Sequence, residues 1–407
     1  MKQAAFTDSE KSFLISQIPE WEKALMGNRR QLEQYPDAPV LLAGAQYPGI
    51  WLEHNQDNLF FCEYDPVCAW ASQDIFMKHQ REDGLLPFAL PTSYKDPKSY
   101  FYPSPALFWH VQSIYPFVRC AMTVARKAER PEEDFFRIYE TGKKYDDWLS
   151  RFRDHGQTGL VEMFCEYDTG HDQSPRVQND GIPHTCPEND ACNMPDMRIM
   201  PILSADLSAM RYGAREALAE LAELLGRDRE ATLWREKAQE TRNAIQKYLF
   251  DPEDDFYYDR DTRGFRKYRS EHITRLFLNK VLTQKEFDAI YDRYFTVEGK
   301  EFYPAYPIPS MSIDDPAFVK SCPLNSWGSN AQALTALRTL FWMDHYGRSS
   351  DQTALLSLWL RAFCNDPARG CRQEVNPFTG LFVDGGGKNY TPALILMIQA
   401  VKRLGWL

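Results

Sequence analysis

A polar cluster near the middle of the chain is the first candidate for chemistry. It covers residues 165–176 with the sequence CEYDTGHDQSPR, and it places the carboxyls of Asp168 and Asp172 close together. Gly170 allows a sharp turn, and Tyr167 offers an aromatic surface. Burial among aromatic side chains raises the pKa of a carboxyl because it disfavours the charged form, which would suit Asp172 to act as a general acid. The alternative is an Asp- and Gly-rich turn with solvated carboxylates.

A second cluster lies near the C-terminus. Residues 372–380 read RQEVNPFTG, so Glu374 comes directly before a turn that contains Asn376, Pro377 and Gly380. A carboxylate in this position could take a proton from water and act as a general base. A surface glutamate beside a turn is the alternative interpretation.

The elements that must position these side chains are mostly helices. Apolar residues recur at spacings of three and four between residues 202 and 226, which predicts an amphipathic helix. Further helices are expected at 8–34, 66–81, 105–128, 131–152, 228–249, 271–294, 330–346, 351–364 and 390–404. Strand-like alternation is confined to short pieces, such as a hairpin over 256–264.

Long connections separate these helices and hold most of the Trp, Tyr, Asp, Asn and Gly residues. They cover residues 36–64, 83–104, 155–200, 296–329 and 365–389. Long aromatic-rich loops in a compact domain are usually functional, so we expect a binding face there. Alternating long and short connections between helices predict an all-α toroid with minor β-hairpins. No linker divides residues 1–407, so we expect a single domain.

Composition excludes several classes of protein. The 407 residues include 47 basic and 57 acidic side chains, and the resulting net charge of −10 argues against nucleic-acid binding. No apolar stretch reaches about 18 residues and no signal pattern opens the chain, so we expect a cytoplasmic protein without membrane spans. The nine cysteines form no CxxC pair, which predicts reduced thiols and no structural zinc.

The two polar clusters resemble motifs of glycoside hydrolase family 63 and the related bacterial mannosylglycerate and glucosylglycerate hydrolases. YDTGHDQSPR is similar to WESGxDNSPRW, and QEVNPFTG is similar to E(Y/N)YDPxTG. QREDGLLP, SPALFW and PIPSMSIDDPAF resemble other motifs of the family, in the same order. The resemblance implies an (α/α)6 barrel that hydrolyses a small α-linked glucoside- or mannoside-like substrate with inversion. It also implies that Asp172 is the general acid, that Glu374 is the general base, and that no metal or cofactor is required.

Departures from the family pattern concern the substrate contacts. The family segment FWDSFF appears here as IWLEHNQDNLFF, so Trp51 matches its Trp, and Glu53, His54 or Asp57 replaces its Asp. A histidine bonded within the core is the alternative interpretation of His54. In SCPLNSW, the Trp of the family's RGPxW motif is displaced to Trp327 or replaced by Asn325.

The remaining expected contacts come from the acid loop and the aromatic residues. Trp51, Tyr167 and Trp327 would stack on sugar rings, Gly170 would shape the loop, and Gln173 and Arg176 would orient it or contact hydroxyl groups. The expected partner is a small carbohydrate, with neither nucleic acid nor membrane, and the sequence does not indicate an oligomeric state.

Two other functions stay open at this point. A sugar isomerase or epimerase on the same toroid would abstract a proton with a histidine, for which His171 and His184 are candidates. A carbohydrate-binding protein without catalytic activity is the third interpretation.

Overall fold

Amphipathic helices provide most of the secondary structure of the chain, which a computed structural model describes over residues 1–383 and 388–407. The α-helices are α1 (Asp8–Ser16), α2 (Ile18–Gly27), α3 (Asn58–Phe61), α4 (Pro66–Lys78), α5 (Phe117–Lys127), α6 (Glu132–Phe152), α7 (Pro175–Gln178), α8 (Ala205–Leu224), α9 (Asp228–Leu249), α10 (His272–Leu278), α11 (Gln284–Tyr294), α12 (Ala333–Trp342), α13 (Ser349–Asn365) and α14 (Thr391–Arg403). Three 3-10 helices are η1 (Leu52–Asp57), η2 (Glu166–Asp168) and η3 (Pro187–Asn189). The predicted predominance of helices is confirmed.

The strands are short and pair only in small antiparallel sheets. They are β1 (Arg29–Leu32), β2 (Tyr35–Leu41), β3 (Gly49–Trp51), β4 (Ala89–Pro91), β5 (Glu162–Met163), β6 (Ile202–Leu203), β7 (Phe250–Asp251), β8 (Phe256–Tyr257), β9 (Asp259–Asp261), β10 (Gly264–Arg266), β11 (Ala331–Gln332) and β12 (Glu374–Val375). The largest sheet has the order β10-β9-β6-β5, and β11 pairs with β12. Both sheets lie beside the candidate site and hold loops from distant parts of the chain together.

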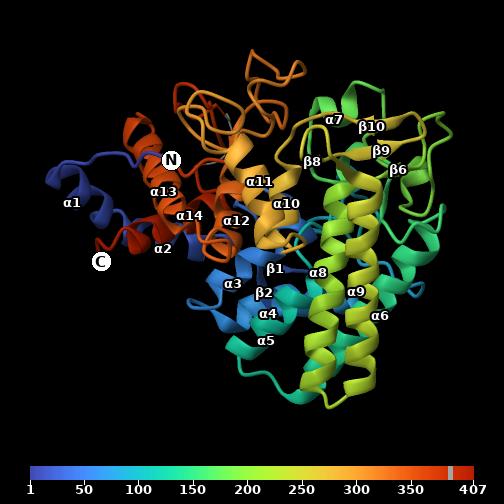
Figure 1. The fold of residues 1–407 in the computed structure, drawn as a ribbon. Helices are drawn as coiled ribbons and strands as arrows, with labels where there is room; N and C mark the ends of the chain where they lie inside the picture. Colours follow the sequence, from blue (N-terminus) through green and yellow to red (C-terminus); the bar gives the residue numbers. More distant parts are fainter. Residues whose placement is uncertain (384–387) are drawn as a thin grey trace.

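A closed circuit of contacts connects one set of helices. It passes from η1 and α3 to α5, then to α8, α10, α12 and α14, and α14 contacts η1 again. A second helix packs against most of these: α4 on α3, α6 on α5, α9 on α8, α13 on α12 and α2 on α14. The α8–α9 pair is the long antiparallel hairpin in Figure 1, and Trp148, Trp342 and Trp359 are fully buried between the helices.

Three predicted helices differ from the structure at a proline, a cap or a loop. The helix expected at 8–34 is divided into α1 and α2 because Pro19 begins a new helix, and the residues after Asn28 form the β1–β2 hairpin. The segment 105–116 is a loop rather than part of a helix, and α5 begins only after Pro116. The helix expected at 271–294 is divided because Thr283 caps a separate helix, α11.

The long connections gather at one end of the molecule. In Figure 1, the segment between α11 and α12 and the loops around α7 extend to the same side. Both termini lie on the side of the molecule that carries α1, α2 and α13 (Figure 1). Within residues 1–383 and 388–407, no helix has the length and apolar character needed to cross a bilayer.

Candidate active site

A cavity of about 430 Å³ opens among the long loops. Its volume lies in the range usual for small-molecule sites. Polar and aromatic side chains from several loops and helix ends form its wall: Gln46, Tyr47, Pro48, Trp51, Glu53, His54, Gln112, Gly170, Asp172, Leu324, Asn325, Trp327, Leu334, Gln373, Glu374 and Tyr390.

Asp172 lies in the wall of this cavity, in the loop between η2 and α7. Burial of its carboxyl raises the pKa to about 7, although the Asn325 side chain donates a hydrogen bond to Oδ2 at 3.1 Å, which acts in the opposite direction. The backbone N–H of Trp327 donates to the backbone oxygen of Asp172 at 3.1 Å and fixes the loop. The carboxyl is therefore suited to hold a proton at neutral pH.

Glu374 lies in β12, and its carboxylate contacts the backbone of Asn325. Its carboxylate accepts hydrogen bonds from the backbone N–H groups of Asn325 and Ser326, from Asn330 Nδ2 at 2.7 Å and from Gln332 Nε2 at 3.2 Å. Burial raises the pKa of Glu374, while these donors lower it in part because they favour the charged form. These four donors hold the carboxylate in the cavity wall, and among the hydrogen-bond partners described for it in residues 1–383 and 388–407 there is no Lys or Arg to neutralise its charge.

Glu53 is a third carboxylate in the cavity wall, and it is charged. Arg338 Nη2 lies 3.1 Å from Oε1, and Gln112 Nε2 donates to Oε2 at 3.0 Å. Burial raises the pKa of Glu53, but the positive charges of Arg338 and Arg275 outweigh this effect and hold the pKa below its ordinary value. Gly170, with φ +66°, passes so close that an added Cβ would lie 2.4 Å from Oε2.

His54 lines the cavity, whereas Asp57 lies behind it. His54 Nδ1 is 3.3 Å from Asp57 Oδ2, and His54 Nε2 is 3.4 Å from the Tyr390 hydroxyl. Asp57 is 1% exposed and does not belong to the cavity wall. Of the three residues expected to replace the family's aspartate, Glu53 and His54 therefore reach the cavity, and Asp57 orients His54.

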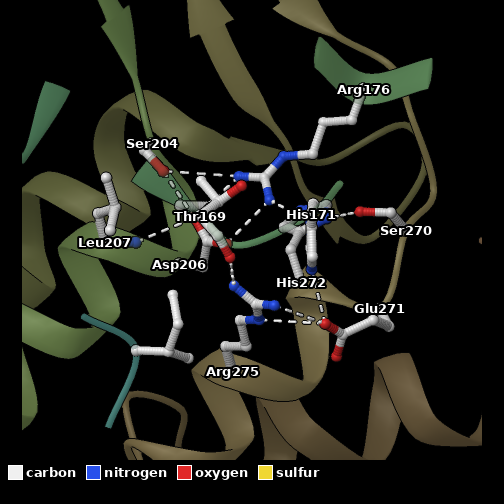
Figure 2. Close-up of polar contacts among 12 residues, drawn as sticks. Thr169, His171, Arg176, Ser204, Asp206, Leu207, Ser270, Glu271, His272 and Arg275 are labelled. Carbon is white, nitrogen blue, oxygen red and sulfur yellow. Dashed lines mark hydrogen bonds and ion pairs between the residues drawn. The ribbon is translucent and has the colours of Figure 1, made fainter. Parts of the chain in front are cut away.

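Arg176 anchors the loop of Asp172 through a network of buried ion pairs. It binds Asp206 of α8 through two nitrogens at 2.8 Å, and Arg275 of α10 lies 3.0 Å from Asp206 (Figure 2). Arg176 also binds Asp259 of β9 at 2.6 and 2.8 Å. All four side chains are buried. Because Arg176 is occupied by two carboxylates and lies outside the cavity wall, it supports the loop rather than contacting a ligand.

His171 belongs to the same buried network. Arg176 Nη1 lies 3.1 Å from His171 Nδ1, so this nitrogen accepts, and Nε2 donates to Glu271 at 2.7 Å (Figure 2). Burial lowers the pKa of His171 to about 4. Both ring nitrogens are engaged, and the imidazole is neutral.

Comparison with known proteins places the chain in a family. Residues 59–391 match the mannosylglycerate hydrolase MGH1-like glycoside hydrolase domain. The chain belongs to this family. Membership in the MGH1-like family makes the protein a glycosidase, and it confirms the resemblance to family 63 that the sequence motifs indicated.

Solved structures share the fold of this MGH1-like chain. A GH63 mannosylglycerate hydrolase from Thermus thermophilus in complex with Tris has 18% identity and a TM-score of 0.71, covering 94% of this chain and 99% of that chain. Neutral trehalase Nth1 from Saccharomyces cerevisiae has 13% identity and a TM-score of 0.65, covering 90% of this chain and 73% of that chain. A rhamnosidase from Klebsiella oxytoca with rhamnose bound has 13% identity and a TM-score of 0.63, covering 97% of this chain and 64% of that chain.

The structure brings together most of the residues expected to contact substrate. Trp51, Glu53, His54, Gly170, Asp172, Trp327 and Glu374 line the cavity of this MGH1-like glycosidase. Tyr167 lines a smaller adjoining cavity together with Asp172. Gln173 is exposed and lines neither cavity, and the buried Asp57, His171 and Arg176 also lie outside both.

Sequence reasoning did not identify Gln112, Tyr390 or Arg338, and it considered Asn325 only as a replacement for Trp. Gln112 was assigned to a helix, although its φ of +38° belongs to the loop before α5. Arg338 lies inside the regular helix α12, and its contact with Glu53 could not be predicted because the two residues are far apart in the sequence. Gln373 could have been found, since it directly precedes the predicted base.

One group of side chains near the site has the composition of a metal site. Ligand atoms of Cys165, Asp168 and Cys186 lie within 4.8 Å of one another. However, Arg153 binds both oxygens of Asp168, at 2.6 and 3.1 Å, and the backbone N–H groups of Val111 and Phe164 also donate to this carboxylate. A cation at this position would face the guanidinium, so we interpret the group as structural.

Proposed function

We propose that this glycosidase hydrolyses a small α-linked glycoside, of the glucoside or mannoside type, with inversion at the anomeric carbon. Asp172 gives its proton to the leaving oxygen, and Glu374 takes a proton from the attacking water. The observation that carries this proposal is that one cavity holds a carboxyl with a pKa of about 7 and a second carboxylate with four hydrogen-bond donors, both bonded to Asn325.

Inversion sets a requirement on the distance between the two carboxyls. An inverting site needs about 6.5–9.5 Å between the carboxyls to leave room for water, whereas a retaining site needs only about 5–5.5 Å. Asn325 contacts Asp172 with its side-chain amide and Glu374 with its backbone N–H, so both carboxyls border one residue of the cavity wall. The family resemblance supports the same stereochemistry.

We further infer that the helices form a single (α/α)6 barrel. The closed circuit from η1 through α14 provides the inner helices, and the helices packed against them provide the outer ones. The long connections then lie at the end that carries the site.

The histidine-based alternative has less support. His171 is neutral and both its nitrogens are bonded within the buried network, while His184 is bound to Glu166 at 2.6 Å and stacks on Tyr167. Neither residue lines the cavity that contains Asp172 and Glu374. A base that abstracts a proton from a sugar carbon must reach the bound sugar.

Activity of two variants on α-linked disaccharides and glycosyl-glycerates tests the proposal. We expect Asp172→Asn and Glu374→Gln each to lower kcat at least about a hundredfold without loss of folding, as is usual when a general acid or base is removed. Asp196→Asn and Glu82→Gln change exposed carboxylates and serve as controls. Near-normal turnover by either site variant would reject its assignment.

Leaving-group chemistry separates the two roles. A dinitrophenyl glycoside expels a stable anion that needs no proton, so we expect Asp172→Asn to lose much less activity on it than on a disaccharide. Glu374→Gln should lose activity equally on both substrates, because the water still requires a base. NMR of the first product should show the anomer opposite to that of the substrate, and the same anomer would exclude inversion.

A further inference from the structure

A second cavity adjoins the first on the far side of Asp172. It has a volume of about 160 Å³ and is lined by Trp51, Phe88, Tyr100, Phe101, Trp109, His110, Gln112, Tyr167, Asp172 and Thr185. Trp51, Gln112 and Asp172 belong to both cavities, whereas Glu374 belongs only to the larger one. Asp172 therefore stands at the junction of the two spaces.

This placement orients the substrate, given the proposed function. The general acid protonates the oxygen that joins the sugar to its leaving group, and the base acts on a water at the opposite face of the sugar. The sugar must then occupy the cavity that contains Glu374, and the leaving group must extend past Asp172. We propose that the second cavity is the leaving-group subsite, and that it takes an uncharged ring, either an aryl group or a second sugar, rather than a small carboxylate such as glycerate.

The shape and chemistry of the wall favour a ring. Trp109 is partly exposed and packs against Tyr100, with ring centroids 5.2 Å apart and planes at 84°, and against Phe88 at 5.9 Å. Phe101 lies 6.1 Å from the same indole. An apolar cavity of about 150 Å³ accommodates benzene, so this volume suits one six-membered ring against an aromatic face.

The charges around the two cavities disfavour an anion. Among the described residues that line them there is no Lys or Arg, but there are three carboxyls, those of Glu53, Asp172 and Glu374. His110 supplies no positive charge, because burial lowers its pKa to about 4. A carboxylate in the second cavity would lose water without gaining a cation, which is costly.

The substrate test uses glycosides of one sugar with different leaving groups. We expect the phenyl glycoside and the corresponding disaccharide to have kcat/KM values at least about tenfold above the methyl glycoside, and at least about a hundredfold above the glycosyl-glycerate. Equal values for the phenyl and methyl glycosides, or preference for the glycerate, would overturn the proposal.

Two variants locate the effect in the second cavity. Trp109→Ala should lower kcat/KM about tenfold on the phenyl glycoside and less than about twofold on the methyl glycoside, whereas Phe136→Ala, at an exposed aromatic on α6, should change neither. Tyr100 is 77% exposed, so Tyr100→Arg should fold and add the missing cation, shifting preference toward the glycerate by about tenfold. Equal losses by Trp109→Ala on both glycosides would contradict the subsite.

A binding measurement keeps this proposal separate from the catalytic one. Nitrophenol and D-glycerate are titrated into the wild-type protein and Trp109→Ala, with tryptophan fluorescence as the readout. Nitrophenol should bind more tightly than glycerate, and Trp109→Ala should weaken only nitrophenol. This result without hydrolysis of any glycoside would support the cavity assignment and reject the proposed function, while tighter binding of glycerate would overturn the cavity assignment.

Discussion

At the residue scale, the site depends on two carboxyls in different surroundings. Burial raises the pKa of Asp172 to about 7, and its one amide donor opposes this rise only in part. Glu374, in contrast, has four hydrogen-bond donors that favour its charged form. Since the acid must be protonated and the base ionised, kcat/KM should fall above about pH 7 as Asp172 ionises. It should also fall at acidic pH as Glu374 becomes protonated.

The same shift affects stability. The raised pKa of Asp172 means that its contribution to stability is present below the unfolded-state pKa of about 3.9 and is lost as the pH rises toward 7. At pH 8 the folded protein must bury a charged Asp172, and Asp172→Asn removes this cost. We therefore expect the variant to have a higher free energy of unfolding than the wild type, by up to about 4 kcal/mol at pH 8 and by less at pH 5. Urea unfolding at both pH values measures the difference, and a variant that gains nothing at pH 8 would contradict the shift.

At the element scale, the acid loop is held by its turn and by the network beneath it. Gly170 adopts φ +66°, and its close approach to Glu53 leaves no room for a side chain. Gly181, with φ +69°, lies on the same long connection and has open space around it. Substitution at Gly181 thus tests only the energetic cost of the left-handed backbone conformation, whereas substitution at Gly170 adds the steric clash with Glu53.

Alanine at these two positions provides a matched prediction. Gly181→Ala should cost about 1 kcal/mol of stability and leave kcat unchanged, because only the left-handed conformation is penalised. Gly170→Ala should cost more and lower kcat about tenfold or more, because Glu53 and Asp172 must move apart. Thermal unfolding and kinetics measure both effects, and identical behaviour of the two variants would show that the close approach does not matter.

At the whole-molecule scale, the first helices of the chain pack against the last ones. Trp21 of α2 is 4% exposed and meets Phe363 of α13 edge-on, with centroids 5.1 Å apart and planes at 83°. α2 also packs on α14, and the N-terminal amine is paired with Asp351. The ends of the chain thus contribute to stability although they are remote from the cavity wall.

Removing this contact should separate stability from catalysis. Trp21→Ala should lower the free energy of unfolding by about 3–5 kcal/mol, as expected for a large buried aromatic, with kcat unchanged at temperatures where the protein is folded. Leu233→Ala on α9 is a control at a half-exposed side chain and should cost less than about 0.5 kcal/mol. A comparable loss in both variants would mean that Trp21 does not secure the ends.

The sequence predicted the helices where apolar periodicity was regular, as in α8 and α9. It also predicted Asp172 and Glu374, two of the three carboxyls that line the cavity, since each lies in a compact local motif. It gave Arg176 two possible roles, to orient the acid loop or to contact hydroxyl groups, and could not choose between them because its partners, Asp206 and Asp259, come from distant elements and have no local signal. It left Glu53, His54 and Asp57 as alternatives for the aspartate of the family, because the sequence does not show in which direction each side chain of this 3-10 turn points.

Asn325 contacts both proposed catalytic carboxyls, so a change at this residue tests whether the pKa of Asp172 sets the pH range of activity. Its side-chain amide holds the pKa of Asp172 down, while its backbone N–H, set by a left-handed φ of +51°, serves Glu374. Glycine accepts that backbone conformation and would keep the second bond while giving up the first. If Asp172 is the acid, we expect Asn325→Gly to move the alkaline limit of activity upward and to leave the acidic limit in place.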